Sequence, residues 1–247
     1  MTYGALLAEG KTKQIFAHPT NPDWAVVVSK DAITAGDGAR RHIIPGKGAL
    51  SGATTANIFT LLVRNHVPTH YIERLSDTDM VVQRCQMIPI EVVTRRHATG
   101  SYLRRHPELT EGHRFEPLVV EFFFKDDANH DPLMHADELI QAKITDNATL
   151  EHITDIAKSV FEILERTWHA QRVTLVDMKI EFGRTNAGEL VVADVIDNDS
   201  WRLWPHGNKD QMLDKQVYRN MREVTDEGLA QIKALYATVK DYTDTWV

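Results

Sequence analysis

The fold is decided by two stretches, VTLVDMKIEF at residues 173–182 and VVADVIDNDSWRLW at residues 191–204. Each begins as an apolar run that favours a buried strand, and each carries acidic residues where the strand would end. In the first stretch Asp177, Lys179 and Glu181 are spaced by two, so their side chains point to one face of a strand. We therefore predict a strand that presents charged side chains to a single face.

The second stretch places Asp194 and two further aspartates ahead of Arg202. If the two strands are adjacent, Lys179, Glu181 and Asp194 point into one cleft, where carboxylate oxygens for a hard cation lie beside a basic side chain. ATP with Mg²⁺ needs this combination, because oxygen ligands hold the metal and a cation balances the phosphates. The pattern predicts phosphoryl or acyl-phosphate chemistry.

Length and composition narrow the class of protein. The chain has 247 residues, of which 43% are hydrophobic and 26% charged, and its net charge is −7. This length suffices for one large domain or two lobes. The negative charge argues against a nucleic-acid or membrane-surface binder. Cys85 is the only cysteine, which excludes an intrachain disulfide and fits a reducing compartment.

Location and assembly are less strongly indicated. No apolar run approaches the roughly 18 residues that span a bilayer. The first residues, MTYGALLAEGKTKQ, have no basic segment ahead of an apolar one, so we expect no signal peptide and a cytoplasmic location. The sequence leaves the oligomeric state open, with a homo-oligomer among the alternatives.

Strands dominate the first part of the chain, and helices alternate with strands after it. Residues 3–30 predict a hairpin with a Gly-Lys turn followed by the strand WAVVVSK. Helical spacing of apolar residues marks residues 48–65, 135–169 and 224–246, and Thr225 is the predicted N-cap of the last helix. The predicted apolar face within the second of these comprises Ile153, Ile156, Ala157, Val160, Ile163 and Leu164. This order predicts an α+β fold.

A division into two lobes is also predicted. Met87-Ile88-Pro89 should break a strand-rich run and form a hinge, because proline interrupts regular pairing. We expect a smaller β-rich lobe at residues 1–88 and a larger mixed lobe at residues 89–247.

Two polar loops in the first lobe are candidate ligand sites. EGKTK at residues 9–13 lies at the tip of the predicted hairpin, where Gly10 would let the backbone approach a phosphate and Lys11 and Lys13 would supply charge. The spacing is not that of a Walker loop, and a solvated turn is the alternative. The loop that carries Asp37 either binds a ligand through backbone N–H groups or is an ordinary connection.

Basic residues of the second lobe are further candidates. Arg95 lies four residues after Glu91 and is followed by a Gly-Ser turn at Ser101. An arginine fork with hydroxyl and backbone donors suits a phosphate or a carboxylate, and a surface ion pair is the alternative.

Two more cationic segments follow along the chain. Lys125 comes directly after an apolar strand. It would either bind an anion or serve only as a flanking charge that opposes aggregation of that strand. Lys215 and Arg219 share one face of a predicted helix, and such charges usually face solvent.

Taken together, these segments resemble the phosphoribosylaminoimidazole-succinocarboxamide synthases, or SAICAR synthetases, of purine synthesis. Eight stretches match in family order, from about residue 8 to about residue 225: EGKTKQIF, DAITAGDGAR, KGALSGATTANIF, MIPIEVVTRRHATGSYLRR, FFFKDDANHDP, LVDMKIEFG, DNDSWRLWP and LDKQVYR. No single stretch decides the resemblance, but their order makes chance a poor explanation.

The resemblance implies a reaction and a nucleotide site. The family joins the carboxylate of carboxyaminoimidazole ribonucleotide to the amine of L-aspartate while ATP is cleaved to ADP and phosphate. A carboxylate is a poor acyl donor, so we expect an acyl phosphate to form first, with direct displacement as the alternative. The nucleotide would lie in a two-lobed cleft broadly like that of protein kinases.

The resemblance also implies roles for individual residues. The residues that contact ATP would be Gly10, Lys11, Lys13, Met87, Lys179, Glu181 and Asp194. The residues that hold Mg²⁺ would be Glu181 and Asp194. The residues that bind the substrates would be Glu91, Arg95, Ser101, Arg202, Lys215 and Arg219. Of these, Arg95, Ser101 and Arg202 would bind the ribonucleotide, chiefly its phosphate. The residues at the reacting centre would be Asp37, Lys125 and Lys179.

The sequence departs from the pattern usual in bacterial members, DE-x-x-P-D-x-x-R-L-W. Val195 replaces the glutamate after Asp194 and Asn198 replaces the proline, so any metal role of that glutamate would fall to Asp197 or Asp199. ADVIDNDSWRLWP is more similar to the synthetase domain of the animal bifunctional enzyme, which carries a carboxylase domain after it. We expect a monofunctional synthetase.

Two other functions remain as alternatives. A small-molecule kinase on the same scaffold would keep Glu181 and Asp194, but it would need a base for a hydroxyl, and the sequence has no H-R-D-type loop. A non-catalytic nucleotide-binding module is favoured only by the change at Val195.

Overall fold

A computed structural model describes residues 3–36 and 38–247, and its fold is mixed α and β, as predicted. The chain forms two compact units. Unit 1 comprises Met1–Met87, Gly183–Asp199 and Leu213–Val247, and unit 2 comprises Ile88–Phe182 and Ser200–Met212. The predicted lobes at residues 1–88 and 89–247 differ from these units, because the segments from Gly183 and from Leu213 group with the N-terminal strands.

Unit 1 is built on a five-stranded antiparallel sheet in the order β1-β2-β3-β7-β6. Its strands are Leu6–Glu9 (β1), Lys13–Ala17 (β2), Trp24–Ser29 (β3), Tyr71–Arg74 (β6) and Asp79–Gln83 (β7). The predicted hairpin and the strand after it are thus confirmed as β1, β2 and β3. The β-branched residues Val26 and Val27 of the central strand are buried, which is what holds this sheet against its helices.

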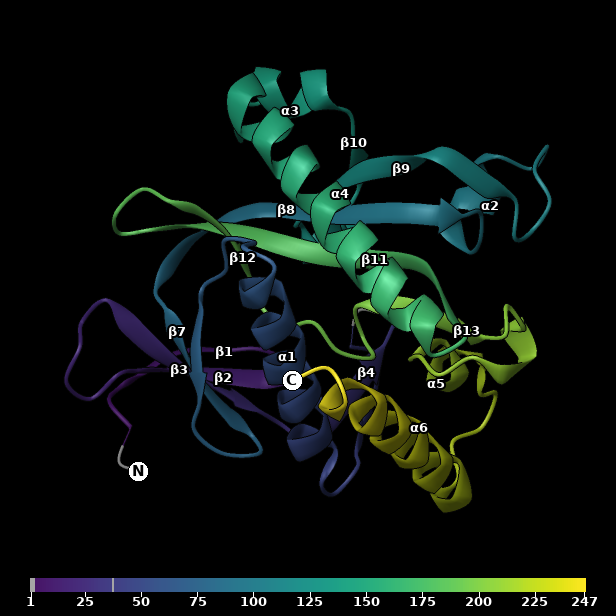
Figure 1. The fold of residues 1–247 in the computed structure, drawn as a ribbon, viewed down its shortest axis with the longest axis horizontal. Coiled ribbons are helices and arrows are strands. Elements are labelled where there is room, and N and C mark those ends of the chain that lie inside the picture. The colour runs from purple at the N-terminus through teal and green to yellow at the C-terminus, as the bar shows by residue number, and fades with distance from the viewer. Residues whose placement is uncertain (1–2, 37) are drawn as a thin grey trace. The chain divides into compact units, whose positions relative to one another are not determined.

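Two long helices complete the core of unit 1. They are Lys47–Arg64 (α1) and Asp226–Asp244 (α6), which confirms both predicted helices, and they lie side by side (Figure 1). Thr225 is the N-cap of α6, as predicted, because its side chain accepts a hydrogen bond from the Gly228 N–H at 3.1 Å. The remaining elements are Ala32–Ala35 (β4), Arg40–Ile43 (β5), Leu190–Ala193 (β12) and Gln216–Asn220 (α5).

The second sheet has the order β10-β9-β8-β11-β12, with β13 paired to β11. Its other strands are Cys85–His97 (β8), Arg114–Phe124 (β9), Leu133–Met134 (β10), Val173–Thr185 (β11) and Trp201–Pro205 (β13). The boundary between the two units falls within β8 and within β11. The adjacency of β11 and β12 confirms that the two opening stretches of sequence form neighbouring strands.

Helix Asn147–Ala170 (α4) lies across this sheet in unit 2 (Figure 1). All six residues of its predicted apolar face are buried. Asp146 caps its first turn by accepting from the Thr149 N–H at 2.8 Å. The predicted helical region starts with a separate short helix, Ala136–Gln141 (α3), and the other short helices are Ser101–Arg105 (α2), Asp127–Asn129 (η1) and Lys209–Gln211 (η2).

The prediction that Pro89 breaks its strand is wrong. β8 runs without interruption from Cys85 to His97. Proline lacks only the N–H donor, and its fixed φ is compatible with an extended strand. Its carbonyl still pairs, because it accepts from the Lys125 N–H at 3.0 Å.

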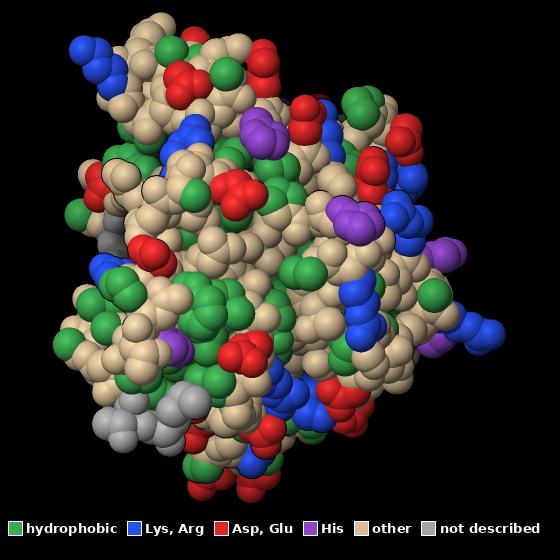
Figure 2. All heavy atoms as spheres, turned by 60° about the vertical axis from the view of Figure 1, so that its left-hand side comes forward, with side chains coloured by type: hydrophobic (Ala, Val, Ile, Leu, Met, Phe, Trp, Pro, Cys, Tyr) green, Lys and Arg blue, Asp and Glu red, His purple; other side chains and the backbone are tan. Residues whose placement is uncertain are grey.

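None of the described helices is long and apolar enough to cross a membrane. On the face in Figure 2, acidic and basic side chains are interspersed, and the described residues there form no broad basic surface. This distribution agrees with the net charge of −7.

Candidate active site

A lysine–glutamate cluster lies in unit 2, where β11 presents alternate side chains to one face. Glu181 is 3% exposed, and each of its carboxylate oxygens accepts from a different lysine: Oε1 from Lys179 at 2.7 Å and Oε2 from Lys125 at 2.6 Å. Lys179 also donates to Glu91 on β8 at 2.9 Å. The structure thus brings together four residues that the sequence analysis had selected from three separate segments.

The charges in this cluster reinforce one another. Burial by itself would raise the pKa of Glu181, but the positive charges of Lys179 and Lys125 prevail and lower that pKa to about 2. Burial would likewise lower the pKa of Lys179, but Glu181 and Glu91 raise it above its ordinary value. Lys179 is therefore a cation at neutral pH, and its charge is held at a fixed position by Glu181 and Glu91.

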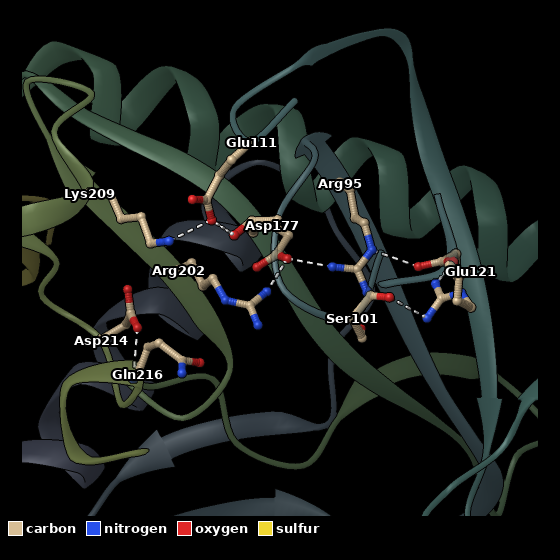
Figure 3. A network of polar contacts seen from close by, with 11 residues as sticks. Arg95, Ser101, Glu111, Glu121, Asp177, Arg202, Lys209, Asp214 and Gln216 are labelled. Atoms are coloured by element: carbon tan, nitrogen blue, oxygen red, sulfur yellow. Dashed lines mark hydrogen bonds and ion pairs between the residues drawn. The ribbon is translucent and has the colours of Figure 1, made fainter. Parts of the chain in front are cut away.

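A second cluster in unit 2 gathers arginines around carboxylates (Figure 3). Oδ2 of the buried Asp177 on β11 accepts from the Nη1 atoms of both Arg95 and Arg202. Arg95 Nε also donates to Glu121 at 2.6 Å, and Arg105 donates to the other oxygen of Glu121. Three guanidinium groups thus share two carboxylates, so the cluster keeps a net positive charge that an anion would balance.

Arg95 belongs to the interior of this cluster and is only 3% exposed. The alternative of a surface ion pair with Glu91 is therefore wrong. Glu91 pairs with Lys179, and Arg95 pairs with Asp177 and Glu121. Side chains four residues apart in an extended strand point to the same face, but each meets its own partner on the neighbouring strand.

The backbone at Gly100 makes room for Arg202. Gly100 has a φ of +57°, and a Cβ atom built there would lie 2.7 Å from Arg202 Nη2. A side chain there would displace the guanidinium group, and the backbone conformation itself favours glycine. Ser101 follows as the first residue of α2, close to the cluster in Figure 3.

In unit 1, the charged turn and the end of β12 meet. Lys13 on β2 forms an ion pair with Asp194, the residue after β12. Asp194 has a φ of +68°, a conformation that aspartate adopts more readily than most residues. Gly10 and Lys11 are exposed in the turn between β1 and β2, and Met87 on β8 is 42% exposed.

The last pair of predicted cations also lies in unit 1. Lys215, just before α5, donates to Asp199 Oδ2 at 2.7 Å, so the expectation that its charge faces solvent is wrong. Its side chain is 11% exposed. Arg219, one helical turn later, is exposed, as such a residue usually is.

The sequence is similar to known proteins along most of its length. The sequence matches a family model described as SAICAR synthetase over residues 6–234. The chain belongs to the SAICAR synthetase family. It is 59% identical over 247 residues to a phosphoribosylaminoimidazole-succinocarboxamide synthase of Roseiflexus sp. (strain RS-1), with 100% of this chain and 99% of that protein covered. It is also 46% identical to a "probable multifunctional protein ADE2" of Caenorhabditis elegans, with 98% of this chain and 58% of that longer protein covered.

Solved structures of SAICAR synthetases share the fold. The phosphoribosylaminoimidazole-succinocarboxamide synthase of Ehrlichia chaffeensis has a TM-score of 0.88 at 30% identity and covers 97% of this chain and 98% of its own. A SAICAR synthetase in complex with ADP has a TM-score of 0.83 at 32% identity, over 94% of this chain and 97% of its own. The resemblance found in the sequence is thereby confirmed.

The residues proposed to hold Mg²⁺ in this SAICAR synthetase family member are Glu181 and Asp194. Residues 3–36 and 38–247 contain no group of three or more His, Cys, Asp or Glu side chains that would hold a metal by themselves. The donor chemistry nevertheless fits, because both side chains offer carboxylate oxygens, the ligands that Mg²⁺ prefers. Both are paired with lysines, so an ion brought in with a nucleotide would compete with those lysines.

Sequence reasoning missed several residues of these clusters. Asp177 was placed on the charged face of β11 without a role, although its spacing of two from Lys179 was a usable signal. Glu121, which holds Arg95, lies in an apolar strand and gave no signal. Asp37, expected at the reacting centre, lies outside the described residues.

The departure at Asn198 from the bacterial SAICAR synthetase pattern has a structural counterpart. The buried Asn198 side-chain amide donates to the Leu213 carbonyl at 2.8 Å, and the Asn198 backbone carbonyl accepts from the Lys215 N–H at 3.1 Å. A proline at this position could not donate the first of these bonds. Asn198 thus ties down the backbone that carries Lys215.

Proposed function

We propose that this chain joins L-aspartate to the carboxylate of carboxyaminoimidazole ribonucleotide, with ATP cleaved to ADP and phosphate. Membership of the SAICAR synthetase family over residues 6–234 carries this proposal. The structure of a family member in complex with ADP supports ATP as the phosphoryl donor. The chain is then a carbon–nitrogen ligase of purine biosynthesis that works in the cytoplasm.

The ribonucleotide phosphate binds at the arginine cluster of unit 2. Arg95 and Arg202 present guanidinium groups that already converge on Asp177. The excess of guanidinium groups over carboxylates favours a dianionic phosphate, and the Ser101 hydroxyl adds a donor. Because Asp177 fixes both arginines before the substrate arrives, binding costs little side-chain entropy.

ATP binds in a two-lobed cleft of the kinase-like kind. Gly10, Lys11 and Lys13 cover its phosphates, and Met87 contacts adenine. The exposure of the turn that carries Gly10 and Lys11 supports this role, because the backbone and the charge there are accessible. Glu181 and Asp194 would hold Mg²⁺, which when bound neutralises charge on the phosphates.

Phosphoryl transfer and acyl transfer both need cations near the oxygen atoms on which negative charge develops. A carboxylate oxygen of the ribonucleotide attacks the γ-phosphorus, and the bond from phosphorus to the leaving ADP oxygen breaks. The aspartate amine then attacks the carbonyl carbon of this acyl phosphate, a C–N bond forms, the carbon–oxygen bond to phosphate breaks, and phosphate leaves with the proton that the amine gives up. Lys179 and Lys125 balance the negative charge that develops, since both are cations held by Glu181. Glu91, Lys215 and Arg219 contact the substrates.

The test is an omission assay with the purified protein. ADP release and product formation are measured with Mg²⁺-ATP, the ribonucleotide and L-aspartate, and each substrate is then left out in turn. We expect ADP only with all three, in equal amount to the succinocarboxamide product. Sustained ADP release without the ribonucleotide, or with another acceptor in place of L-aspartate, would overturn the proposed function.

A further inference from the structure

One carboxylate in unit 1 connects a buried tyrosine to a proposed substrate-binding lysine. Asp199 accepts from the Tyr236 hydroxyl on Oδ1 and from Lys215 Nζ on Oδ2, the latter at 2.7 Å. Tyr236 lies in the middle of α6 and is 1% exposed, whereas the Lys215 side chain is 11% exposed. The contacts therefore run from the interior of the unit outward to the lysine.

A second lysine, on α1, contacts the Tyr236 ring of this network. Lys47, the first residue of α1, is 1% exposed, and its Nζ atom lies 4.7 Å from the centroid of the Tyr236 ring. It also donates to Ser51 at 3.2 Å. Both oxygens of the Asp199 carboxylate are thus held by side-chain donors of unit 1.

The backbone around Lys215 is held from the opposite side. Arg40 on β5 donates to the carbonyls of Tyr218 and Met221, at 3.2 and 2.7 Å, at the end of α5. His42 lies 2.8 Å from the Tyr218 hydroxyl. Together with the two bonds of Asn198, these contacts fix the segment that carries Lys215, so the main freedom left to this lysine is in its side chain.

We propose that Tyr236 and Lys47 are positioning residues for Lys215: Lys47 packs on the Tyr236 ring, the Tyr236 hydroxyl fixes the Asp199 carboxylate, and this carboxylate in turn fixes the Lys215 ammonium group toward its substrate. This inference rests on the proposed function, in which Lys215 binds a substrate. A purely structural role is a poor explanation, because burying ionic groups is costly and an apolar core at these positions would be equally stable. The network instead holds the Lys215 ammonium group at one defined position and leaves it partly accessible.

The test compares two tyrosine-to-phenylalanine variants. Tyr236→Phe removes only the hydroxyl that donates to Asp199. Tyr3→Phe is the matched control, because the Tyr3 hydroxyl also donates to a carboxylate of unit 1, that of Asp79, outside this network. Lys215→Met identifies which of the three substrates depends on the lysine. The Michaelis constant of each substrate and kcat are measured for all variants.

Lys215→Met identifies one affected substrate, and we expect Tyr236→Phe to raise the Michaelis constant of that same substrate by about tenfold. In Tyr236→Phe, kcat and the other two Michaelis constants should stay within about threefold of the wild-type values. Tyr3→Phe should leave all three constants within about twofold. The proposal is overturned if Tyr236→Phe behaves like Tyr3→Phe, or if it affects a different substrate from Lys215→Met. Lys47→Met carries the same expectation and serves if Tyr236→Phe does not fold.

A measurement independent of turnover separates this inference from the proposed function. If the wild-type protein makes no product from the three substrates, the proposed function fails, and the rate of reductive methylation of the Lys215 amine, followed by peptide mass spectrometry, then decides the positioning role. Faster methylation of Lys215 in Tyr236→Phe than in Tyr3→Phe supports it. Equal methylation rates in the two variants overturn it.

Discussion

Glu181 is deeply buried, and each of its two carboxylate oxygens is paired with a positively charged lysine side chain. Lys125 and Lys179 each donate to it at less than 3 Å. A buried carboxylate without such partners would take up a proton, so the two lysines are what keep it charged. Conversely, its charge keeps the two ammonium groups at defined positions, which is what a site for phosphoryl transfer requires.

This pairing predicts how stability depends on pH. The pKa of Glu181 falls from 4.5 to about 2 on folding, so its contribution is fully present above pH 4.5 and is lost as pH falls toward 2. A shift of this size corresponds to about 3 kcal/mol. We expect Glu181→Gln to lower the free energy of unfolding at pH 7 by about that amount, and the deficit to shrink as pH falls through this window.

Urea unfolding at a series of pH values checks this prediction, with Glu108→Gln as the control. Glu108 is 65% exposed and pairs only with His106 among the contacts of its side chain that the structure describes. Its replacement should change the free energy of unfolding by less than about 0.5 kcal/mol at every pH. A constant deficit for Glu181→Gln between pH 7 and 2 would contradict the account.

At the scale of elements, α1 and α6 are joined by a buried amide as well as by apolar packing. The Asn57 side chain of α1 is buried and donates to Thr243 at 3.1 Å and to Asp244 at 2.8 Å at the end of α6. These helices carry Lys47 and Tyr236, so the tie that holds them together also bears on the Asp199 network.

We expect Asn57→Ala to destabilise the protein by about 1–3 kcal/mol, because the buried Thr243 hydroxyl and the Asp244 carboxylate each lose a donor. Asn65→Ala is the control, since the exposed Asn65 donates only to the Leu61 carbonyl of its own helix among its described side-chain contacts. Thermal unfolding of both variants measures the difference. Equal, small losses in the two variants would show that packing alone joins the helices.

Helices and strands were predictable where the apolar residues of a segment keep the spacing of a helix or of a strand throughout. The buried face of α4 and the cap at Thr225 followed from spacing and residue type, because both are local properties. The partners of polar residues were not predictable: spacing places Asn57 on a helix but does not say that Thr243 will face it. Pro89 was misjudged for a related reason, since the tolerance of a strand for proline depends on its neighbours.

At the scale of the whole molecule, the candidate site residues fall into both units. Unit 2 holds the lysine–glutamate and arginine clusters, and unit 1 holds the Lys13–Asp194 pair and the Asp199 network. Eight stretches of sequence in family order predicted the family. They did not predict that segments from Gly183 and Leu213 would join the N-terminal strands, since that grouping depends on long-range packing.

The central claim is that the arginine cluster of unit 2 binds the ribonucleotide, whereas ATP depends on other residues. The most direct test is to compare the Michaelis constants of both substrates in Arg202→Ala and in Arg74→Ala, the latter in a surface ion pair with Asp77. Losing a charge-assisted contact to phosphate costs about 3 kcal/mol, or about a hundredfold. We predict that Arg202→Ala raises the constant of carboxyaminoimidazole ribonucleotide about a hundredfold and that of ATP less than about threefold, while Arg74→Ala changes neither. Equal increases for both substrates in Arg202→Ala would contradict the account.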